Sequence, residues 1–252
     1  MKKKSKLIPL LINNVSDNTK KDTSPIIPQR SKFKGNLSIF NRELTTKQLQ
    51  FLEIAGDKDT KIMFVSGPAG TAKTYLSVLH TLKMIDEKRV SDLIYVRSAV
   101  ECSDSKLGFL PGLVSEKLAP YIQPLMDKLE ELLPKNEINV LMKEERIAAI
   151  SIGFLRGLNW NAKAIILDEA QNCTNREILT FITRVGNFSK VFVLGDPSQA
   201  DINGKSGFLK MFNIFGDDES KQNGIVTFQF TEKDIVRSKL VQFIIEKIRK
   251  TT

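Results

Sequence analysis

The stretch KIMFVSGPAGTAKTYLS, residues 61–77, joins an apolar run, a turn with two glycines and a second run with helical spacing. It matches the phosphate-binding pattern G-x-x-x-x-G-K-[ST] at Gly67, Lys73 and Thr74. Ala72 stands where this pattern has its second glycine. A strand before such a turn and a helix after it surround a phosphate with backbone N–H groups and the positive end of the helix dipole. The stretch therefore predicts an α/β fold built around a P-loop.

Two side chains of this loop have expected roles toward a nucleotide. Lys73 is expected to reach the β and γ phosphates, and Thr74 to supply a hydroxyl to Mg²⁺. A residue that opens a helix has a negative φ, which alanine tolerates, so we expect Ala72 to allow binding. Its methyl group lies where the backbone approaches phosphate closely, so we expect lower affinity or slower turnover. The residues expected to bind the nucleotide are Gly67, Pro68, Ala69, Gly70, Thr71, Ala72, Lys73, Thr74 and Tyr75.

The rest of the chain alternates between short apolar runs and segments of helical spacing, which is typical of a parallel sheet with crossover helices. Several of the runs are apolar throughout, as strands covered on both faces are. The predicted strands are 61–66, 92–97, 146–153, 162–168, 190–195 and 224–230. The predicted helices are 73–87, 115–133, 174–185, 205–215 and 232–250. We therefore expect a mostly parallel sheet with helices on both faces.

The segment between the second and third predicted strands, residues 98–145, is longer than a crossover requires. Pro120 and Pro124 fall inside its amphipathic helical pattern, so this helix is expected to start late or to kink. Long insertions in compact domains often have a function. The segment is therefore a candidate for a specialised surface.

Two further predicted strands end in polar residues, at the edge where open α/β sheets bind their ligands. After AIIL, Asp168 would hold Mg²⁺ through water and Glu169 would orient the attacking water. After VFVLG come Asp196 and Gln199, and Gln199 would sense the γ-phosphate through a hydrogen bond lost on hydrolysis. Taken alone, these endings are also typical of a solvated turn and an ordinary β-turn. Their position after a P-loop favours the catalytic interpretation of the two carboxylates.

Other candidate residues have a simpler interpretation beside the functional one. Gln48 lies on a short predicted helix before the P-loop strand, where its amide would pair with the edge of adenine, or it is a surface glutamine. His80, the single histidine, is interpreted as a packed or solvated helix residue. The two cysteines, Cys102 and Cys173, have no Cys or His at metal-ligand spacing, which excludes the usual zinc frameworks.

A chain of 252 residues with 41% hydrophobic content is expected to form one main domain. Its net charge of +9 is concentrated in residues 1–35, which carry +7, and residues 36–252 carry only +2. Residues 1–35 are predicted to form a disordered or loosely docked arm, either a solubilising tail or a contact to nucleic-acid phosphates. No apolar run approaches the ~20 residues that span a bilayer, and LIPLLI is too short for a signal peptide. We therefore expect a cytoplasmic protein with no membrane partner.

Taken together, these motifs resemble the PhoH-like family, predicted ATPases related to the first helicase superfamily. The resemblance covers about residues 42–248. The matching motifs are GPAGTAKTYLS, VRSAVE followed by LGFLPG, EKLAPYIQPLMDKL, FLRG, IILDEAQN, FITRVGNFSKVFVLGDPSQAD with SGF, and FTEKDIVRSKLVQFII. The resemblance implies that residues 36–252 form a RecA-like P-loop NTPase domain that uses ATP and Mg²⁺.

The resemblance also bears on single residues. The loop lysine, the loop hydroxyl and the two carboxylates keep the roles given above, and Gln199 would read the nucleotide state. Arg237, in DIVRS, matches an arginine near the last strand that stabilises transition-state charge in helicase-like enzymes. Three further arginines match the family pattern, and each is either a phosphate or nucleic-acid contact or a solvent-facing partner of a carboxylate. They are Arg97, Arg156 and Arg184.

The sequence departs from the family pattern at three places. Ala72 replaces a glycine, VRSAVE lacks the proline usual after its arginine, and AISIG lacks a proline that is common there. Only the first of these touches the expected chemistry.

We therefore expect a Mg²⁺-dependent ATPase coupled to RNA or single-stranded DNA in a helicase-like manner. Helicases of this class close two RecA-like domains around ATP, and this chain has room for one. We thus expect a homo-oligomer, such as a ring, in which Arg184 reaches a neighbour's site. A nucleotide-dependent binding module with negligible turnover is an alternative that Ala72 keeps open. A small-molecule P-loop kinase is a further alternative. A kinase needs an acceptor pocket and usually an arginine-rich lid, and the sequence indicates neither, which argues against this alternative.

Overall fold

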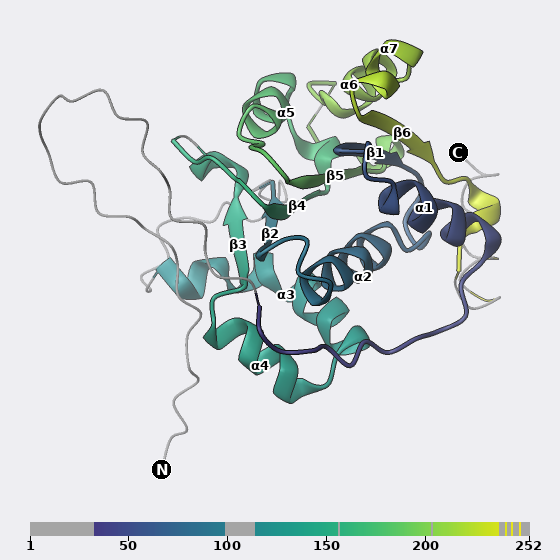
Figure 1. Ribbon diagram of the computed structural model, residues 1–252. Helices are drawn as coiled ribbons and strands as arrows, with labels where there is room; N and C mark the ends of the chain where they lie inside the picture. The colour runs from purple at the N-terminus through teal and green to yellow at the C-terminus, as the bar shows by residue number, and fades with distance from the viewer. Residues whose placement is uncertain are drawn as a thin grey trace, which may run out of the picture.

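The computed structural model describes residues 33–98, 114–155, 157–202 and 204–236, and residues 240, 243 and 247 near the C-terminus; of residues 114–121 it describes the backbone alone. Its centre is a sheet of six parallel strands in the order β3-β2-β4-β5-β1-β6 (Figure 1). The strands are β1 Ile62–Ser66, β2 Asp92–Arg97, β3 Ile147–Ser151, β4 Lys163–Asp168, β5 Lys190–Gly195 and β6 Ile225–Gln229. All six predicted strands are confirmed, with ends that agree to within two residues.

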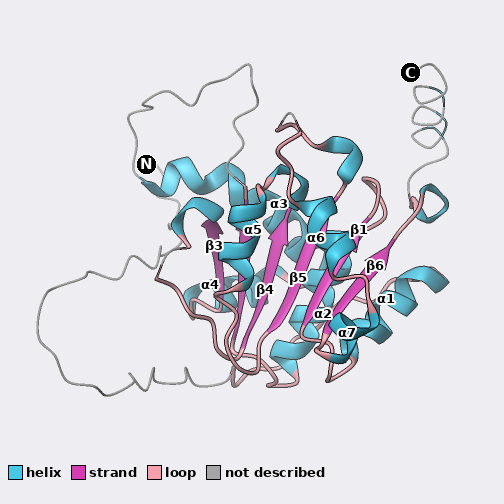
Figure 2. Ribbon diagram, turned by 90° about the horizontal axis from the view of Figure 1, so that it is seen from above, coloured by secondary structure: helices cyan, strands magenta, loops and turns pink. Residues whose placement is uncertain are grey.

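Helices cover both faces of this sheet, and Figure 2 shows the strands running side by side between them. The helices are α1 Thr46–Gly56, α2 Lys73–Asp86, α3 Val114–Leu132, α4 Lys135–Lys143, α5 Asn175–Ile182, α6 Phe208–Ile214 and α7 Asp218–Gln222. Helices α1 to α4 lie on one face, and α5 and α6 lie on the other (Figure 1). The chain therefore has the expected α/β, RecA-like P-loop NTPase fold. None of the described helices is long and apolar enough to cross a bilayer.

The two cores of the molecule follow from the alternation of side chains along each strand. In β1, Met63 and Val65 pack in the core beneath α1 and α2, whereas Phe64 packs in the core beneath α5 and α6. In β5, Phe192 belongs to the first core and Val193 to the second. Each of these strands is apolar on both faces because both faces are covered. That is why its sequence is a continuous apolar run.

Helix α3 confirms the predicted helix 115–133 and excludes a late start at its prolines. It runs from Val114 to Leu132 without a break, so it does not start late at Pro120 or Pro124. Each proline removes one backbone hydrogen bond from the helix. Leu125 and Leu129 are fully buried in the core beside α2, and this packing holds the helix in place across the missing hydrogen bonds.

At three other places the helices differ from those predicted. Helices α4 and α7 were not predicted, because one spans nine and the other five mostly polar residues. The segment 232–250 does not begin as an α-helix: Glu232–Asp234 form a 3₁₀ turn and Ile235 is extended, with φ −69° and ψ 114°.

The segment that precedes α1 is packed against the helical face of the domain (Figure 1). Phe33 is buried, the amide of Leu37 donates to Asp86 at 2.7 Å, and the amide of Phe40 donates to the Leu132 carbonyl at 2.8 Å. We call residues 33–45 the N-terminal strap. The predicted arm overlaps this strap at residues 33–35, where burial of Phe33 shows docking and not disorder. Residues 1–32 lie outside the described part of the chain, so the rest of the arm stays a prediction.

Candidate functional site

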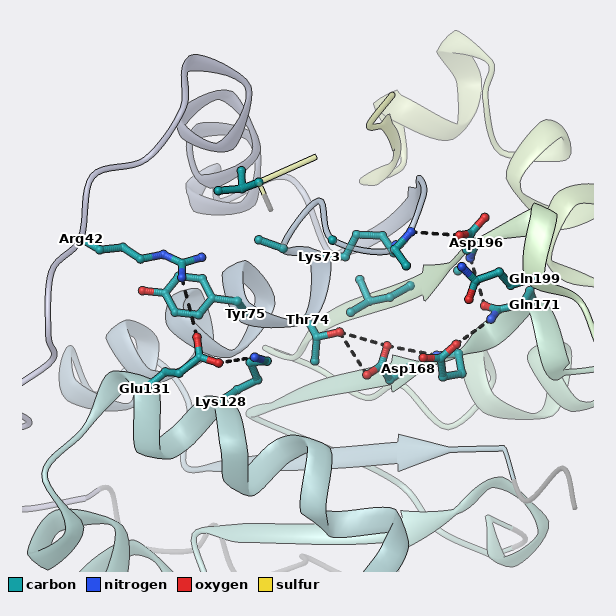
Figure 3. Close-up of a pocket in the computed structure, with 17 residues that line it drawn as sticks. Arg42, Lys73, Thr74, Tyr75, Lys128, Glu131, Asp168, Gln171, Asp196 and Gln199 are labelled. Atoms are coloured by element: carbon teal, nitrogen blue, oxygen red, sulfur yellow. Dashed lines mark hydrogen bonds and ion pairs between the residues drawn. The ribbon is translucent and has the colours of Figure 1, made fainter. Parts of the chain in front are cut away.

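A cavity of about 390 Å³ lies at the carboxyl ends of β1, β4 and β5 (Figure 3). This is the edge at which open α/β sheets bind their ligands. The residues predicted for the site that line the cavity are Ala69, Gly70, Ala72, Lys73, Thr74, Tyr75, Asp168, Glu169 and Gln199. Segments far apart in the sequence therefore meet at one place, as the motifs predicted.

The loop before α2 is a tight structure in which two residues have positive φ. Gly70 has φ 89°, and Ala72 has φ 68° and ψ 23°, in the left-handed region. The expected negative φ at Ala72 is therefore wrong, because α2 begins only at Lys73 and Ala72 is still part of the turn. Alanine in this conformation costs about 1 kcal/mol more than glycine.

Close packing explains the first glycine of the loop. A Cβ atom at Gly67 would lie 2.6 Å from the Cβ of Phe230, just beyond β6. The loop is also fixed from within, because the hydroxyl of Thr71 donates to the Pro68 carbonyl at 2.9 Å. The loop is thus held against the end of the sheet.

Lys73 places its charge inside this loop. Its Nζ donates to the carbonyl of Gly67 at 2.6 Å and to that of Pro68 at 3.1 Å. An ammonium group held within a turn of backbone amides at the start of a helix favours an anion at the same place. The geometry of Lys73 therefore suits a phosphate chain.

Thr74 and Asp168 form a pair that joins the start of α2 to the end of β4. The Thr74 hydroxyl donates to the two Asp168 carboxylate oxygens at 3.2 and 3.1 Å. Tyr95 donates to the same carboxylate at 2.6 Å, and the Glu169 amide donates to it at 3.0 Å. Burial, reinforced by the Asp168 charge, raises the pKa of Tyr95 far above its usual value, so its hydroxyl remains a donor. The carboxylate of Asp168 is thus fixed from three sides.

This pair provides hard oxygen ligands, which Mg²⁺ prefers. Among the residues that the structure describes, no group of three or more His, Cys, Asp or Glu side chains is placed to hold a metal. A magnesium ion at a nucleotide site takes one or two carboxylate or hydroxyl ligands and completes its shell with phosphate oxygens and water. Thr74 and Asp168 therefore fit a Mg²⁺ bound together with a phosphate ligand.

A chain of hydrogen bonds links Glu169 to the P-loop. Gln171 donates to the Glu169 carboxylate at 2.6 Å and accepts from the Asp196 amide at 3.0 Å. The Asp196 carboxylate accepts from the Ala69 amide at 3.0 Å. The ends of β4 and β5 and the phosphate loop are thereby connected. Gln171 was not predicted for the site, although the sequence DEAQ placed its amide two residues after Glu169.

Glu169 itself has a left-handed backbone, with φ 55° and ψ 39°. Such a conformation is rare for a residue with a side chain and is concentrated at functional sites. Arg97 lies 3.7 Å from the Glu169 carboxylate, so it pairs with a carboxylate that lines the cavity. The backbone and Arg97 together direct the Glu169 side chain.

Gln199 lies in a 3₁₀ turn, Pro197–Gln199, directly after β5. The Asp196 carboxylate caps this turn, accepting from the backbone amide of Ser198 at 3.1 Å. The backbone amide of Gln199 donates to the Asp196 carbonyl at 3.0 Å. Gln199 therefore lines the cavity from a turn that is tied to the same aspartate as the phosphate loop.

The opposite end of the cavity is formed by residues that the sequence did not single out, with the exception of Tyr75. The Arg42 guanidinium lies 3.5 Å from the centre of the Tyr75 ring and 3.7 Å from the Glu131 carboxylate. Glu131 also pairs with Lys128, one turn earlier on α3. The insertion thus contributes Lys128 and Glu131 to the cavity, a role that was not predicted for it. No motif in the sequence pointed to Arg42, whose position in the cavity depends on the packing of the N-terminal strap.

Five predicted site residues of the described chain do not line the cavity: Gly67, Pro68 and Thr71 of the phosphate loop, and Gln48 and Arg184. Gln48 caps α1: it is buried, and its Oε1 accepts from the Thr45 amide at 3.1 Å. Arg184 follows α5, where its carbonyl accepts from the amide of Trp160, three residues before β4 begins. Since the strands are parallel, Arg184 lies at the amino edge of the sheet, opposite the cavity.

The remaining candidates are a packed residue and residues that the structure does not describe. His80 is buried and packs edge-on against Phe192, with ring centroids 5.9 Å apart. Burial, with a smaller contribution from Lys190, lowers the pKa of His80 to about 3, so it is a neutral core residue. Arg237, Arg156 and Cys102 lie outside the described residues.

Comparison with known sequences identifies relatives across most of the chain. The sequence profile of the PhoH-like protein family matches residues 42–249. A PhoH-like protein of Mycobacterium leprae is 38% identical over 207 residues, which cover 81% of this chain and 57% of that protein. A PhoH-like protein of Bacillus subtilis is 36% identical, covering 77% and 60%, and protein PhoH of Escherichia coli K12 is 31% identical, covering 88% and 58%.

The chain therefore matches about three fifths of the length of these relatives. Among solved structures, the chain is similar to the Sulfolobus solfataricus SWI2/SNF2 ATPase core in complex with dsDNA, with a TM-score of 0.43 and 13% identity. That similarity covers 77% of this chain and 45% of the other.

Proposed function

Because this chain belongs to the PhoH-like protein family, we propose that its cavity binds ATP with Mg²⁺ and that the protein hydrolyses the bound ATP. One observation carries the proposal: the Thr74 hydroxyl lies against the fixed Asp168 carboxylate beside Lys73, in one cavity. The same cavity contains Glu169 and Gln199. This combination suits phosphoryl transfer to water.

The residues of the cavity have separate proposed roles in hydrolysis. Lys73 and the loop amides would bind the β and γ phosphates, and Thr74 and Asp168 would hold Mg²⁺. Mg²⁺ held by these two residues would supply the positive charge that offsets the negative charge developing on the phosphates. Glu169 would accept a hydrogen bond from the attacking water and orient it for in-line attack. The hydrogen bond from Gln171 and the charge of Arg97 hold the Glu169 carboxylate ready for this role.

Gln199 would sense the γ-phosphate from the turn after β5. A hydrogen bond from Gln199 to that phosphate would disappear on hydrolysis. Because Asp196 connects this turn to the P-loop, loss of this hydrogen bond would affect the position of both segments. We propose this link as the origin of a nucleotide-dependent change in the protein.

Efficient hydrolysis also requires a cation that stabilises the transition state. We propose Arg237 for this role within the chain, on the resemblance of DIVRS to the family pattern. Arg184 lies at the opposite edge of the sheet from its own cavity, and so we propose that it serves the cavity of a neighbour in a homo-oligomer, such as a ring.

We further propose that hydrolysis is coupled to RNA or single-stranded DNA in a helicase-like manner. The family resemblance and the concentration of positive charge in residues 1–35 support this coupling. The test is phosphate release from ATP with Mg²⁺, measured with and without single-stranded RNA or DNA and repeated with Lys73→Ala. Release that Lys73→Ala abolishes and that a nucleic acid stimulates would support the proposal. Release that Lys73→Ala leaves unchanged would rule out the P-loop as its source.

A nucleotide-dependent binding module with negligible turnover is a second candidate. Ala72 favours it, because its methyl group lies in the phosphate loop, where the backbone is expected to approach the phosphates closely and where a glycine would leave space. The same experiment separates the two. A binding module would bind ATP and yet release phosphate no faster than Lys73→Ala.

A further inference from the structure

The end of the cavity away from Gln171 and Gln199 is built from three parts of the chain (Figure 3). Arg42 comes from the N-terminal strap, Tyr75 from α2, and Lys128 and Glu131 from α3. Tyr75 directly follows Thr74, so a phosphate chain bound over Lys73 and Thr74 would extend its other end toward this group. The position suits the nucleoside part of a nucleotide.

Arg42 and Tyr75 form a stacked pair within this group. The guanidinium carbon lies 3.5 Å from the ring centroid, which is a close stacking distance. Tyr75 is only 3% exposed, whereas the Arg42 side chain is 43% exposed and lines the cavity. The ring therefore covers one face of the guanidinium, and the other face remains open to a ligand in the cavity.

Two further contacts hold Arg42 in position. One is an ion pair at the edge of its guanidinium, and the other is a hydrogen bond of the nearby backbone. Glu131 lies 3.7 Å from Arg42 and pairs with Lys128 as well. Two residues before Arg42, the Phe40 amide donates to the Leu132 carbonyl at 2.8 Å, which ties the N-terminal strap to α3. Burial raises the pKa of Tyr75, so its ring stays uncharged beneath the cation. The planar guanidinium of Arg42 thus has a fixed orientation in the wall of the cavity.

We propose that Arg42 is the surface on which the base of the bound nucleotide stacks, with Tyr75 supporting it from behind and Glu131 positioning it. This inference rests on the proposed nucleotide-binding function. A planar cation attracts the π-face of a base, as guanidinium groups do in nucleic-acid recognition. Stacking depends on aromatic area and reads few hydrogen bonds. The site therefore prefers purine over pyrimidine nucleotides and discriminates weakly between the two purines.

The test compares binding of ATP, CTP and inorganic tripolyphosphate, each with Mg²⁺, to the full chain and to four variants. Tripolyphosphate has no base, so it reports on the phosphate loop alone. Arg42→Ala is expected to weaken ATP binding roughly tenfold or more and to leave tripolyphosphate binding unchanged. Arg42→Lys is expected to behave in the same way, because lysine keeps the charge and loses the plane.

The other two variants serve as a graded test and a control. Glu131→Gln is expected to reduce the ratio of ATP to tripolyphosphate affinity by less than Arg42→Ala does. Arg89→Ala removes an arginine of similar exposure that pairs with Glu87 at 3.5 Å, beyond the other end of α2, and is expected to leave all three affinities unchanged.

The outcomes distinguish this inference from the proposed function. A wild-type chain that binds neither ATP nor tripolyphosphate would overturn the proposed function and this inference with it. Normal ATP binding by Arg42→Ala, or equal weakening of ATP and tripolyphosphate, would overturn the stacking role alone. Full rescue by Arg42→Lys would show that charge is what matters, and would overturn it too.

Discussion

Ala72 and Glu169 line the same cavity, and both have left-handed backbone conformations, with φ 68° and 55°. A side-chain-bearing residue in this region is strained by about 1–2 kcal/mol. One of the two lies in the phosphate loop and the other carries the carboxylate proposed to orient water. Strain at both positions indicates that the surrounding contacts, among them the Thr74–Asp168 pair, fix the backbone against its preference.

Replacement of Ala72 by glycine should relieve this strain. We expect Ala72→Gly to raise the free energy of unfolding by about 1 kcal/mol, less the entropy that glycine adds to the unfolded chain. ATP affinity or turnover should rise as well, since the loop gains freedom to adapt to phosphate. Chemical denaturation and ATP titration measure the two effects. Ala69→Gly is the matched control, because Ala69 has no positive φ and should gain nothing.

Glu169→Gln keeps the shape of the side chain and removes its charge. We expect ATP binding to persist and phosphate release to fall by about a hundredfold or more, as on loss of a residue that activates water. Equilibrium binding and phosphate release are measured on the same preparation. Loss of binding together with turnover would show instead that Glu169 supports the structure of the cavity.

At the scale of the elements, Gln171 is the piece that connects the ends of β4 and β5. It is 1% exposed, and its amide is used in both directions, toward Glu169 and toward Asp196. Both partners lie on segments proposed to contact the γ-phosphate. A substitution at Gln171 therefore affects the ends of β4 and β5 and the phosphate loop.

We expect Gln171→Ala to lower the free energy of unfolding by about 1–3 kcal/mol, because it leaves a buried amide of Asp196 without its acceptor. Phosphate release should fall more than ATP binding does, since Glu169 loses a hydrogen bond. Gln123→Ala is the comparison: Gln123 makes an exposed hydrogen bond to Asp127 on α3. Equal effects of the two substitutions on stability and turnover would contradict the connecting role.

The elements also show what could be predicted from the sequence. The strands were predictable because Met63, Phe64 and Val65 form a run that is apolar on both faces. The helix 115–133 was also predictable, and α3 agrees with it to within one residue at each end. The φ of Ala72 was not, because it depends on tertiary packing that overrides local preference. Arg42 could not be found either. Its place in the cavity results from a contact between the N-terminal strap and α3, segments some ninety residues apart in the chain.

At the scale of the molecule, Arg184 makes assembly testable. If Arg184 completes a neighbour's cavity, specific activity should rise with protein concentration. A mixture of Arg184→Ala and Lys73→Ala chains should recover activity that neither has alone, because some interfaces pair an intact loop with an intact arginine. The arginine in such a position contributes about 10³–10⁵ in rate. Substituting Arg89→Ala for Arg184→Ala gives the control, since that chain should be active by itself.

Activity that is independent of concentration, with no recovery in the mixture, would contradict the assembly. It would leave Arg237 as the proposed source of positive charge, acting within its own chain.

The N-terminal strap has a consequence for how the cavity fills. It lies outside the sheet and is attached to the domain by the buried side chains of Phe33 and Leu37 and by hydrogen bonds such as those of Leu37 and Phe40. A peripheral segment of this kind can detach locally at a lower free energy than global unfolding requires. Each detachment would carry Arg42 away from Tyr75. Any ligand that contacts Arg42 would then bind the attached state alone, so occupancy of the cavity and docking of the N-terminal strap form a single coupled equilibrium.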